Sequence, residues 1–340
     1  MRGKQGNNKG RRTQGNKRTG SEGGNPRGNR SNRSGHIRPR SNDNEDTPDR
    51  FARGDRKKTR KKSDPFANNK VKGDRPDYEK SEKLKQAEQR YSDKNKTRTA
   101  EEKKDAGVRL NKYIANAGIC SRREADKLIA AGDIKVNKKV VTEMGYKVQP
   151  GDKVTYKGRG LKNEKPVYVL LNKPKDFITT TDDPHDRRTV MDLVKQSGDE
   201  RIFPIGRLDR QTTGLLLLTN DGELAEKLAH PSNNIKKVYQ VDLDKPITEN
   251  DFLAIQEGIK LDDGQVEVDE VVVLDKDRQI LGLEIHIGRN RIVRRLFEHL
   301  GYTVVKLDRV FYAGLTKKDL PRGKWRYLSE KEVVRLKYLR

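Results

Sequence analysis

Apolar residues are almost absent from the first third of the chain. In residues 1–106, aromatic residues such as Phe51 and Tyr78 stand alone among Gly, Asn, Ser, Lys and Arg. A segment of this composition cannot bury enough apolar surface to offset the entropy that it would lose on ordering. We therefore predict that residues 1–106 form a disordered basic tail and that the folded part begins near Gly107.

The chain is basic along its whole length. Residues 1–106 hold 32 Lys and Arg against 16 Asp and Glu, a net charge of +16, and the rest supplies +9 of the total of +25. Hydrophobic residues make up only 31% of the sequence. Both parts therefore favour a polyanionic partner, as expected of a protein that binds nucleic acid.

Several other classes of protein are excluded by what the sequence lacks. It has no apolar run of about 18 residues, which excludes a membrane span, and its first residues have no apolar signal core. The single cysteine, Cys120, permits no disulfide within the chain and fits a reducing cytoplasm. The five His are scattered, and no glycine-rich phosphate loop is present, so we expect neither a metal nor a nucleotide cofactor.

The first ordered module is predicted over residues 107–157. Leu110 and Ile114 have helical spacing, and Ser121 with Glu124 forms a capping-box pattern at the start of a second helix. The stretch "IKVNKKVV" predicts a short hairpin. Two small helices and a hairpin thus follow one another.

Basic residues gather on the second helix and the hairpin of this module. A solvated charged face is the commoner explanation for one basic helix, but here the cluster recurs on two adjacent elements, which favours contact with nucleic acid. The candidate residues are Arg122, Arg123, Lys127, Lys135, Lys138 and Lys139. The stretch "RLNKYIANAGICSRREADKLIAAGDIKVNKKVV" resembles the RNA-binding S4 domain, a fold that serves many RNA proteins and names no reaction.

A second domain is predicted over residues 163–340. Strands are expected at "VYVLLNKP", "LLLLT", "KVYQVDL", "VEVDEVVVL", "LGLEIHI" and "TVVKLDRVFYAG", with helices at "ELAEKLAHP" and "NRIVRRLFEHLG". Many strands with few, irregularly placed helices predict an α+β fold built on a mixed, largely antiparallel sheet.

One carboxylate stands out in this domain. Asp209 lies between Arg207 and Arg210, directly before an apolar run that begins at Leu215. It could be a salt-bridged loop residue, or a carboxylate that the flanking guanidinium groups keep ionised as a nucleophile or general base.

Two further stretches could complete such a site. Tyr239 lies in a predicted strand, where packing is the usual role of Tyr. A helix that starts near Asn290 would bring Arg291 and Arg294 to one side with Arg295 beside them. One of these could reach a buried carboxylate while the others contact phosphates.

Together these motifs resemble the RsuA/RluB group of pseudouridine synthases. "NKPKDFITTTDDPHDRRTVMDL", "GRLDRQTTGLLLLTNDGEL", "KVYQV", "GRNRIVRRLFEHLG" and "VVKLDRV" occur in the family's order. With the S4-like module, the resemblance covers residues 108 to about 330. The combination of "GRN" and "VRR" favours the branch that modifies large-subunit ribosomal RNA.

The resemblance implies a reaction and a set of roles. A uridine in ribosomal RNA is isomerised to pseudouridine without a cofactor, with Asp209 as the essential carboxylate. Asp209 could attack C1′, attack the ring, or remove the 2′ proton. Tyr239 would stack on the target base, Arg294 would pair with Asp209, and Leu307 with Arg207 would help to form the pocket. The target base would be flipped out or unpaired.

Two other functions remain open from the sequence. A non-catalytic ribosomal-RNA-binding assembly factor would use the same basic tail and RNA-binding module. A metal-dependent nuclease could use Asp182, Asp183 and Asp221 as ligands, although these residues lie in turn-like stretches where Asp is common. We expect a monomer that acts on ribosomal RNA, either free or in an assembling subunit.

Overall fold

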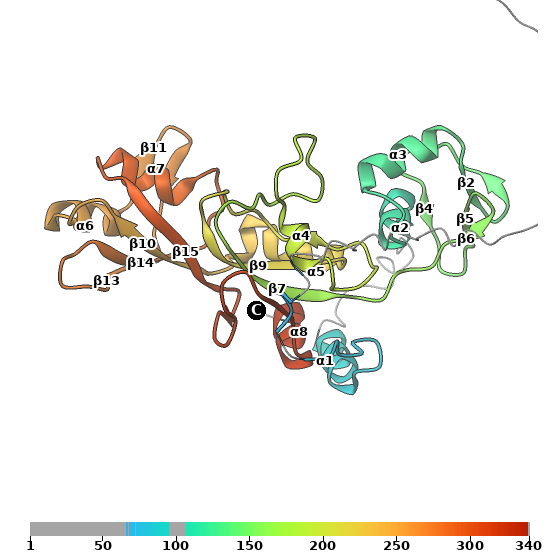
Figure 1. Ribbon diagram of the computed structural model, residues 1–340. Coiled ribbons are helices and arrows are strands. Elements are labelled where there is room, and N and C mark those ends of the chain that lie inside the picture. Colours follow the sequence, from blue (N-terminus) through green and yellow to red (C-terminus); the bar gives the residue numbers. More distant parts are fainter. Residues whose placement is uncertain (1–65, 67, 72, 95–106, 339–340) are drawn as a thin grey trace, which may run out of the picture. The chain divides into compact units, whose positions relative to one another are not determined.

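The computed structural model describes residue 66 and residues 68–71, 73–94 and 107–338 (Figure 1). Most of the predicted tail, residues 1–65, 67, 72 and 95–106, lies outside the described residues. Among those described, no helix is both long and apolar enough to cross a membrane.

The first module contains the two predicted helices, α2 (Leu110–Asn116) and α3 (Arg122–Ala130). The capping box at Ser121 forms as predicted: Glu124 N donates to Ser121 Oγ at 3.3 Å, and Ser121 N donates to Glu124 Oε2 at 2.8 Å. The strands are β1 (Val108–Arg109), β2 (Ile134–Val136), β3 (Lys139–Val140), β4 (Lys147–Val148), β5 (Val154–Tyr156) and β6 (Arg159–Gly160). The β3-β2-β5-β6 sheet extends to Gly160, beyond the predicted boundary at residue 157.

The second domain is built on one large sheet in the order β13-β14-β10-β15-β9-β7-β17, with β16 on β15 and β8 on β9. Its strands are β7 (Tyr168–Lys173), β8 (Phe203–Pro204), β9 (Thr213–Thr219), β10 (Lys237–Leu243), β13 (Glu270–Val273), β14 (Ile280–Ile285), β15 (Val304–Tyr312), β16 (Leu315–Thr316) and β17 (Trp325–Tyr327). A separate hairpin joins β11 (Ile259–Leu261) to β12 (Gly264–Val266). Within the large sheet only the β15–β9 pair is parallel. The predicted mixed, largely antiparallel sheet is confirmed.

The helices of this domain are α4 (Val190–Val194), α5 (Gly222–Ala229), α6 (Glu249–Glu257), α7 (Ile292–His299) and α8 (Glu330–Tyr338), with the 3₁₀ turn η1 (Pro231–Asn233). The centre of the sheet is covered on both faces. Leu216 and Leu218 of β9 lie in one hydrophobic core, and Leu215 and Leu217 lie in the other. This two-sided burial explains why the strand is a continuous apolar run instead of an alternating one.

The parallel junction between β9 and β15 is short and close. Only Asp308↔Thr213 and Arg309↔Gly214 are in register across it. Gly214 has φ +107°, and a Cβ at this position would lie 2.3 Å from the carbonyl oxygen of Arg309. Glycine is therefore required where the two strands meet.

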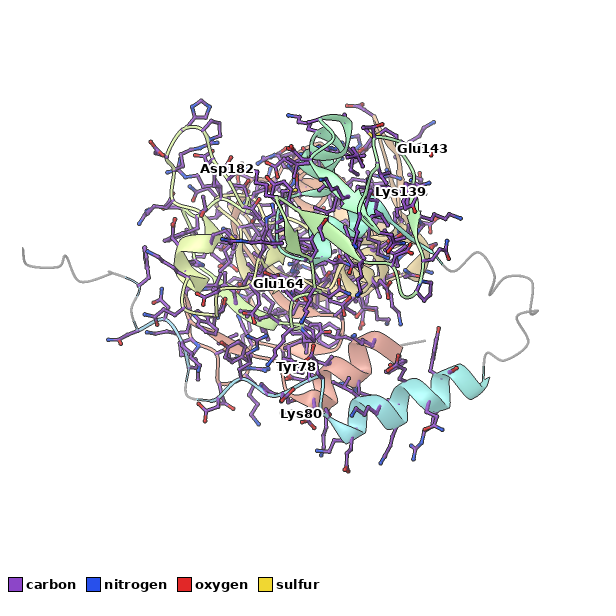
Figure 2. The ribbon with its side chains drawn as sticks, turned by 90° about the vertical axis from the view of Figure 1, so that its right-hand side faces the viewer. Tyr78, Lys80, Lys139, Glu143, Glu164 and Asp182 are labelled. Atoms are coloured by element: carbon purple, nitrogen blue, oxygen red, sulfur yellow. The ribbon has the colours of Figure 1, made fainter. Side chains whose placement is uncertain are left out.

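The prediction that residues 1–106 form a disordered tail is wrong for residues 68–71 and 73–94. Lys70 forms a parallel bridge with Trp325 at the free edge of β17, and Val71 N donates to Trp325 O at 2.8 Å. Tyr78 is only 5% exposed and donates its hydroxyl to Leu328 O at 2.7 Å (Figure 2).

Helix α1 (Glu82–Lys94) follows this segment and packs beside α8 (Figure 1). The ring of Tyr78 meets that of Tyr168 edge to face, with centroids 4.9 Å apart, and Leu84 joins the same core. The composition argument failed here because it counted only local apolar clusters. Tyr78, one of these isolated residues, finds its partners about 90 and 250 positions away, at Tyr168 and Leu328.

Candidate active site

The loop that carries Asp209 is fixed by a buried lysine. Lys173, the last residue of β7, is fully buried, and its Nζ donates to the carbonyl oxygens of Pro174, Asp209, Arg210 and Thr212 at 2.8–3.3 Å. Burial lowers the pKa of Lys173 to about 8, although the negative charge of Asp209 acts in the opposite direction. Lys173 therefore positions the backbone on either side of the candidate carboxylate.

The flanking arginines do not clamp Asp209 as predicted. Arg210 Nε lies 3.3 Å from Asp176 Oδ1, and Arg207 is exposed. Within the described ranges, no Lys, Arg or His nitrogen comes within 4 Å of the Asp209 carboxylate oxygens. Successive side chains of a loop diverge, so neighbours in the sequence need not meet in space.

Asp209 and Tyr239 share one cleft of about 340 Å³. Tyr239 lies on β10, is 8% exposed, and faces Leu283 and Arg309 on the neighbouring strands. Among the described lining residues Asp209 is the one carboxylate, and the cations are Arg207, Lys237, Arg289, Arg291 and Arg309. This excess of positive charge suits a nucleotide with its phosphates.

Arg294 is close enough to Asp209 for their charges to interact, but it makes no direct ion pair. It is 9% exposed on α7, and its Nη1 donates to Val304 O at 2.7 Å. Burial and the charge of Arg291 lower its pKa, while Asp209 acts to raise it. Its Nε is buried and lacks a hydrogen-bond partner in the described part of the chain.

Leu307 lies outside the lining of the cleft. It is 5% exposed, belongs to the hydrophobic core, and pairs with Val241 of β10. Leu307 therefore differs from its predicted role as a wall of the pocket, because its side chain packs in the hydrophobic core.

Comparison with known proteins identifies the family. Residues 167–299 match the RNA pseudouridylate synthase family, and residues 108–154 match the S4 domain. The ribosomal large subunit pseudouridine synthase B of Bacillus subtilis is 46% identical over 236 residues, which are 68% of this chain and 96% of that protein. The chain belongs to the RNA pseudouridine synthase family.

Two further proteins are similar to this chain. The dual-specificity RNA pseudouridine synthase RluF of Escherichia coli K12 is 39% identical over 236 residues, covering 68% of this chain and 79% of that protein. A solved pseudouridylate synthase is 30% identical, with a TM-score of 0.48, and the match covers 67% of this chain and 99% of that one.

Three of the cations that line the cleft were missed by the sequence analysis, namely Lys237, Arg289 and Arg309. Lys237 donates to Ile235 O at 2.9 Å and to His286 O, and burial lowers its pKa to about 8, with the charge of Arg309 acting in the same direction. Arg309 is 3% exposed, and its guanidinium lies over the Tyr312 ring at 4.5 Å. The available signal was a charged residue inside "KVYQV" and "LDRVFY", which are otherwise strand-like.

The arginines at the start of α7 differ in their surroundings. Arg291 lines the cleft and donates to Glu298 at 3.1 Å. Arg295 does not line the cleft, and its Nη2 donates to Asp263 at 2.6 Å. Arg289, which the sequence analysis did not select, lines the cleft and lies 3.6 Å from Asp263.

The six basic candidates of the S4 domain are all exposed. Within the described ranges, none has a carboxylate oxygen within 4 Å. They are Arg122, Arg123, Lys127, Lys135, Lys138 and Lys139. Charges without a protein partner on one small domain are available for phosphate contacts.

The Asp residues considered as nuclease ligands have structural roles or lie in a loop. Asp183 accepts a hydrogen bond from Arg187 at 2.6 Å, which is the main reason that its pKa falls to about 2. Asp221 caps α5 and lies 2.9 Å from Lys337 Nζ, while Asp182 is exposed in a loop. In the described part of the chain, no three His, Cys, Asp or Glu residues form a metal-binding group.

Proposed function

We propose that this synthase isomerises a particular uridine of large-subunit ribosomal RNA to pseudouridine. The similarity to the Bacillus subtilis enzyme, whose name specifies the large ribosomal subunit, supports this substrate class. The main structural support is the cleft itself, where Asp209 is the one carboxylate among the described lining residues and five of its companions are cationic.

The reaction needs no external co-reactant. The C1′–N1 bond of the nucleoside breaks, a C1′–C5 bond forms, and the proton on C5 is replaced by one on N1, so product and substrate have the same composition. Asp209 would act as nucleophile at C1′ or on the ring, or as the base that takes the 2′ proton. Each of these roles needs an ionised carboxylate beside the target nucleoside.

Tyr239, Arg207 and Arg291 of the cleft would bind and orient the flipped nucleotide, and Arg294, which lies outside the lining, would act on Asp209. Tyr239 would stack on the uracil ring. Arg294, whose Nε is buried without a partner among the described residues, would stabilise the charge of Asp209 when RNA fills the cleft. Arg207 and Arg291 would contact flanking phosphates.

The S4 domain would hold the RNA outside the cleft through its exposed cations. The basic N-terminal residues would add sequence-independent affinity. We place the enzyme in the cytoplasm as a monomer that acts on ribosomal RNA, free or within an assembling subunit.

The central test is Asp209→Asn, which keeps the size of the side chain but removes the nucleophile and base. Pseudouridine is mapped in ribosomal RNA from a strain that lacks the gene and carries either form on a plasmid. One large-subunit position is expected to regain pseudouridine with the wild-type protein and with Asp182→Asn, an exposed control, but not with Asp209→Asn. Restoration by Asp209→Asn would refute the catalytic assignment. Wild-type protein that restores no site would favour the assembly-factor alternative.

A further inference from the structure

The candidate active site is divided by the β9–β15 junction. Asp209 lies on the loop that precedes β9, while Tyr239 lies on β10, on the other side of β15. Arg294 is held to the same side as Tyr239 because it binds Val304 O at the start of β15. The distance between the two halves of the site therefore depends on how β9 is joined to β15.

Backbone pairing alone joins these strands only weakly. Two residue pairs are in register between β9 and β15, whereas six join β9 to β7 and seven join β10 to β15. A short parallel pairing between two long strands leaves room for rotation and sliding. Additional cross-links are needed if the site is to keep one geometry.

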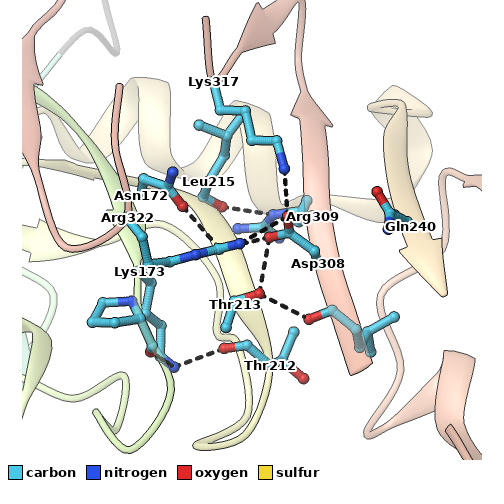
Figure 3. A network of polar contacts seen from close by, with 12 residues as sticks. Asn172, Lys173, Thr212, Thr213, Leu215, Gln240, Asp308, Arg309, Lys317 and Arg322 are labelled. Atoms are coloured by element: carbon cyan, nitrogen blue, oxygen red, sulfur yellow. Dashed lines mark hydrogen bonds and ion pairs between the residues drawn. The ribbon is translucent and has the colours of Figure 1, made fainter. Parts of the chain in front are cut away.

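A polar cluster around the buried Asp308 carboxylate supplies these cross-links (Figure 3). Asp308 of β15 is 9% exposed, and its carboxylate accepts hydrogen bonds from Thr213 Oγ1 of β9 at 2.9 Å and from both terminal nitrogens of Arg322 at 2.7 and 3.0 Å. Lys317 Nζ also donates to it. This carboxylate thus binds β15 to β9 and to the segment that follows β16.

The cluster continues to the strand that fixes the Asp209 loop. Arg322 Nη1 also donates to Asn172 Oδ1 of β7 at 3.0 Å, and Asn172 Nδ2 donates to Leu320 O at 2.7 Å. The next residue after Asn172 is Lys173, the lysine that binds the carbonyl oxygens around Asp209. Two sets of hydrogen bonds, joined by the peptide bond between Asn172 and Lys173, therefore connect β15 to the loop of Asp209.

The cluster lies apart from the cleft. None of Asp308, Lys317 and Arg322 is among the cleft's lining residues. Burial alone would raise the pKa of Asp308, but the hydrogen bonds from Arg322 and Lys317 outweigh it and hold that pKa at about 2. The carboxylate is thus ionised at every working pH, and it is fully engaged by its partners.

We propose that Asp308, Thr213 and Arg322 are positioning residues that set the separation between Asp209 and the Tyr239–Arg294 side of the site. They act through the β9–β15 junction and do not touch the RNA. The inference rests on the proposed function of the cleft, because it concerns the same reacting groups.

Asp308→Asn is the main test, since it keeps the volume but offers one acceptor oxygen instead of two to the Arg322 fork. Turnover is measured with purified full-length protein at saturating RNA, well below the melting temperature. We expect kcat to fall about 10- to 100-fold, the loss that a displacement of about 1 Å can cause. The apparent Kd for RNA should change less than threefold, because the residue does not contact the ligand.

Glu332→Gln is the matched control. Glu332 forms a two-bond ion pair with Arg326, at 2.7 and 2.9 Å, in the same domain but away from the junction. Its loss should lower the melting temperature to a similar extent and leave kcat within twofold. Equal kcat in Asp308→Asn and Glu332→Gln would overturn the proposal. So would a loss in Asp308→Asn that is confined to RNA affinity.

Arg322→Lys gives a second measurement should Asp308→Asn fail to fold. It keeps the positive charge but replaces the fork with a single ammonium. We expect a smaller fall in kcat, about fivefold, and a kcat within twofold of wild type would also overturn the proposal. Failure of the proposed function looks different, since wild-type protein itself would then form no pseudouridine.

Discussion

At the scale of single residues, the anchor of the Asp209 loop comes from far along the chain. The sequence places Arg207 and Arg210 beside the carboxylate, but Arg210 pairs with Asp176. Lys173, 36 positions from Asp209, holds the loop through carbonyl oxygens instead. A lysine at the end of a fully buried strand was the visible signal. Its partners could not be predicted because backbone acceptors leave no mark in the sequence.

Replacing this lysine should disturb both stability and turnover. In Lys173→Met four carbonyl oxygens lose a charged donor, so we expect the free energy of unfolding to fall by about 2–3 kcal/mol and kcat to fall at least about tenfold as the loop loosens. Urea unfolding and turnover at saturating RNA measure the two effects. Lys175→Met, at an exposed position two residues on, should alter neither quantity. An unchanged kcat in Lys173→Met would show that the loop keeps its geometry without the ammonium.

The same lysine should give stability a distinct pH dependence. Its pKa is lowered to about 8 in the folded protein, compared with about 10.4 in an unfolded chain. Between these values the unfolded state binds more protons, so this group makes the free energy of unfolding rise with pH from about 8 to 10. The difference in unfolding free energy between wild type and Lys173→Met, followed by urea titrations across this range, should therefore change with pH. A constant difference would contradict the lowered pKa.

At the scale of elements, local patterns predicted most of the helices and strands but not how the strands meet. The capping box at Ser121 and the apolar strand before Asn220 could be predicted because each depends on residues close together in the chain. The parallel β9–β15 junction could not, because it depends on a close approach between Gly214 and Arg309, 95 positions apart. "TTGLLLL" contains the necessary glycine, but no nearby residue indicates that Arg309 is the residue it approaches.

Gly214→Ala tests this close approach. The new Cβ would lie 2.3 Å from Arg309 O and 2.5 Å from Arg309 N, and the φ of +107° is unfavourable for alanine. Because backbone atoms cannot swing aside as a side chain can, we expect a loss of at least about 3 kcal/mol in the free energy of unfolding. Gly160→Ala, at a strand position with open space, should change it by less than about 1 kcal/mol. Similar stabilities of the two variants would show that the junction can open.

At the scale of the whole molecule, the N-terminal third divides into two parts. Residues 1–65 lie outside the described residues and carry 20 Lys and Arg against 7 Asp and Glu, a net charge of +13. Residues 73–94 instead supply Tyr78 and Leu84 to a hydrophobic core of the second domain. A single tail with a single role is therefore the wrong description, and the two parts should affect the protein differently when they are removed.

Three chains, starting at Met1, Phe66 and Gly107, distinguish the effect of the N-terminal charge on RNA binding from the effect of N-terminal packing on stability. Removal of residues 1–65 takes away a net charge of +13, whereas removal of residues 66–106 takes away a further net charge of only +3. Each phosphate contact by a cation contributes a slope of about −0.7 to the logarithm of affinity against the logarithm of salt concentration on single strands. If the first 65 residues tether RNA, the slope should flatten markedly between the first two chains and little between the last two.

The free energy of unfolding should change little between the first two chains and markedly between the last two. The chain from Phe66 should unfold like the full chain, whereas the chain from Gly107 exposes the surface that Tyr78 and Leu84 cover and should lose roughly 3–5 kcal/mol, since a fully buried side chain of this size contributes about 1.5–3 kcal/mol. Turnover at saturating RNA should be the same for the full chain and the chain from Phe66, because the cleft residues begin at Ile205. Identical salt slopes for these two chains would rule out the tether. A drop in their saturated turnover would mean instead that the first 65 residues contribute to the reaction.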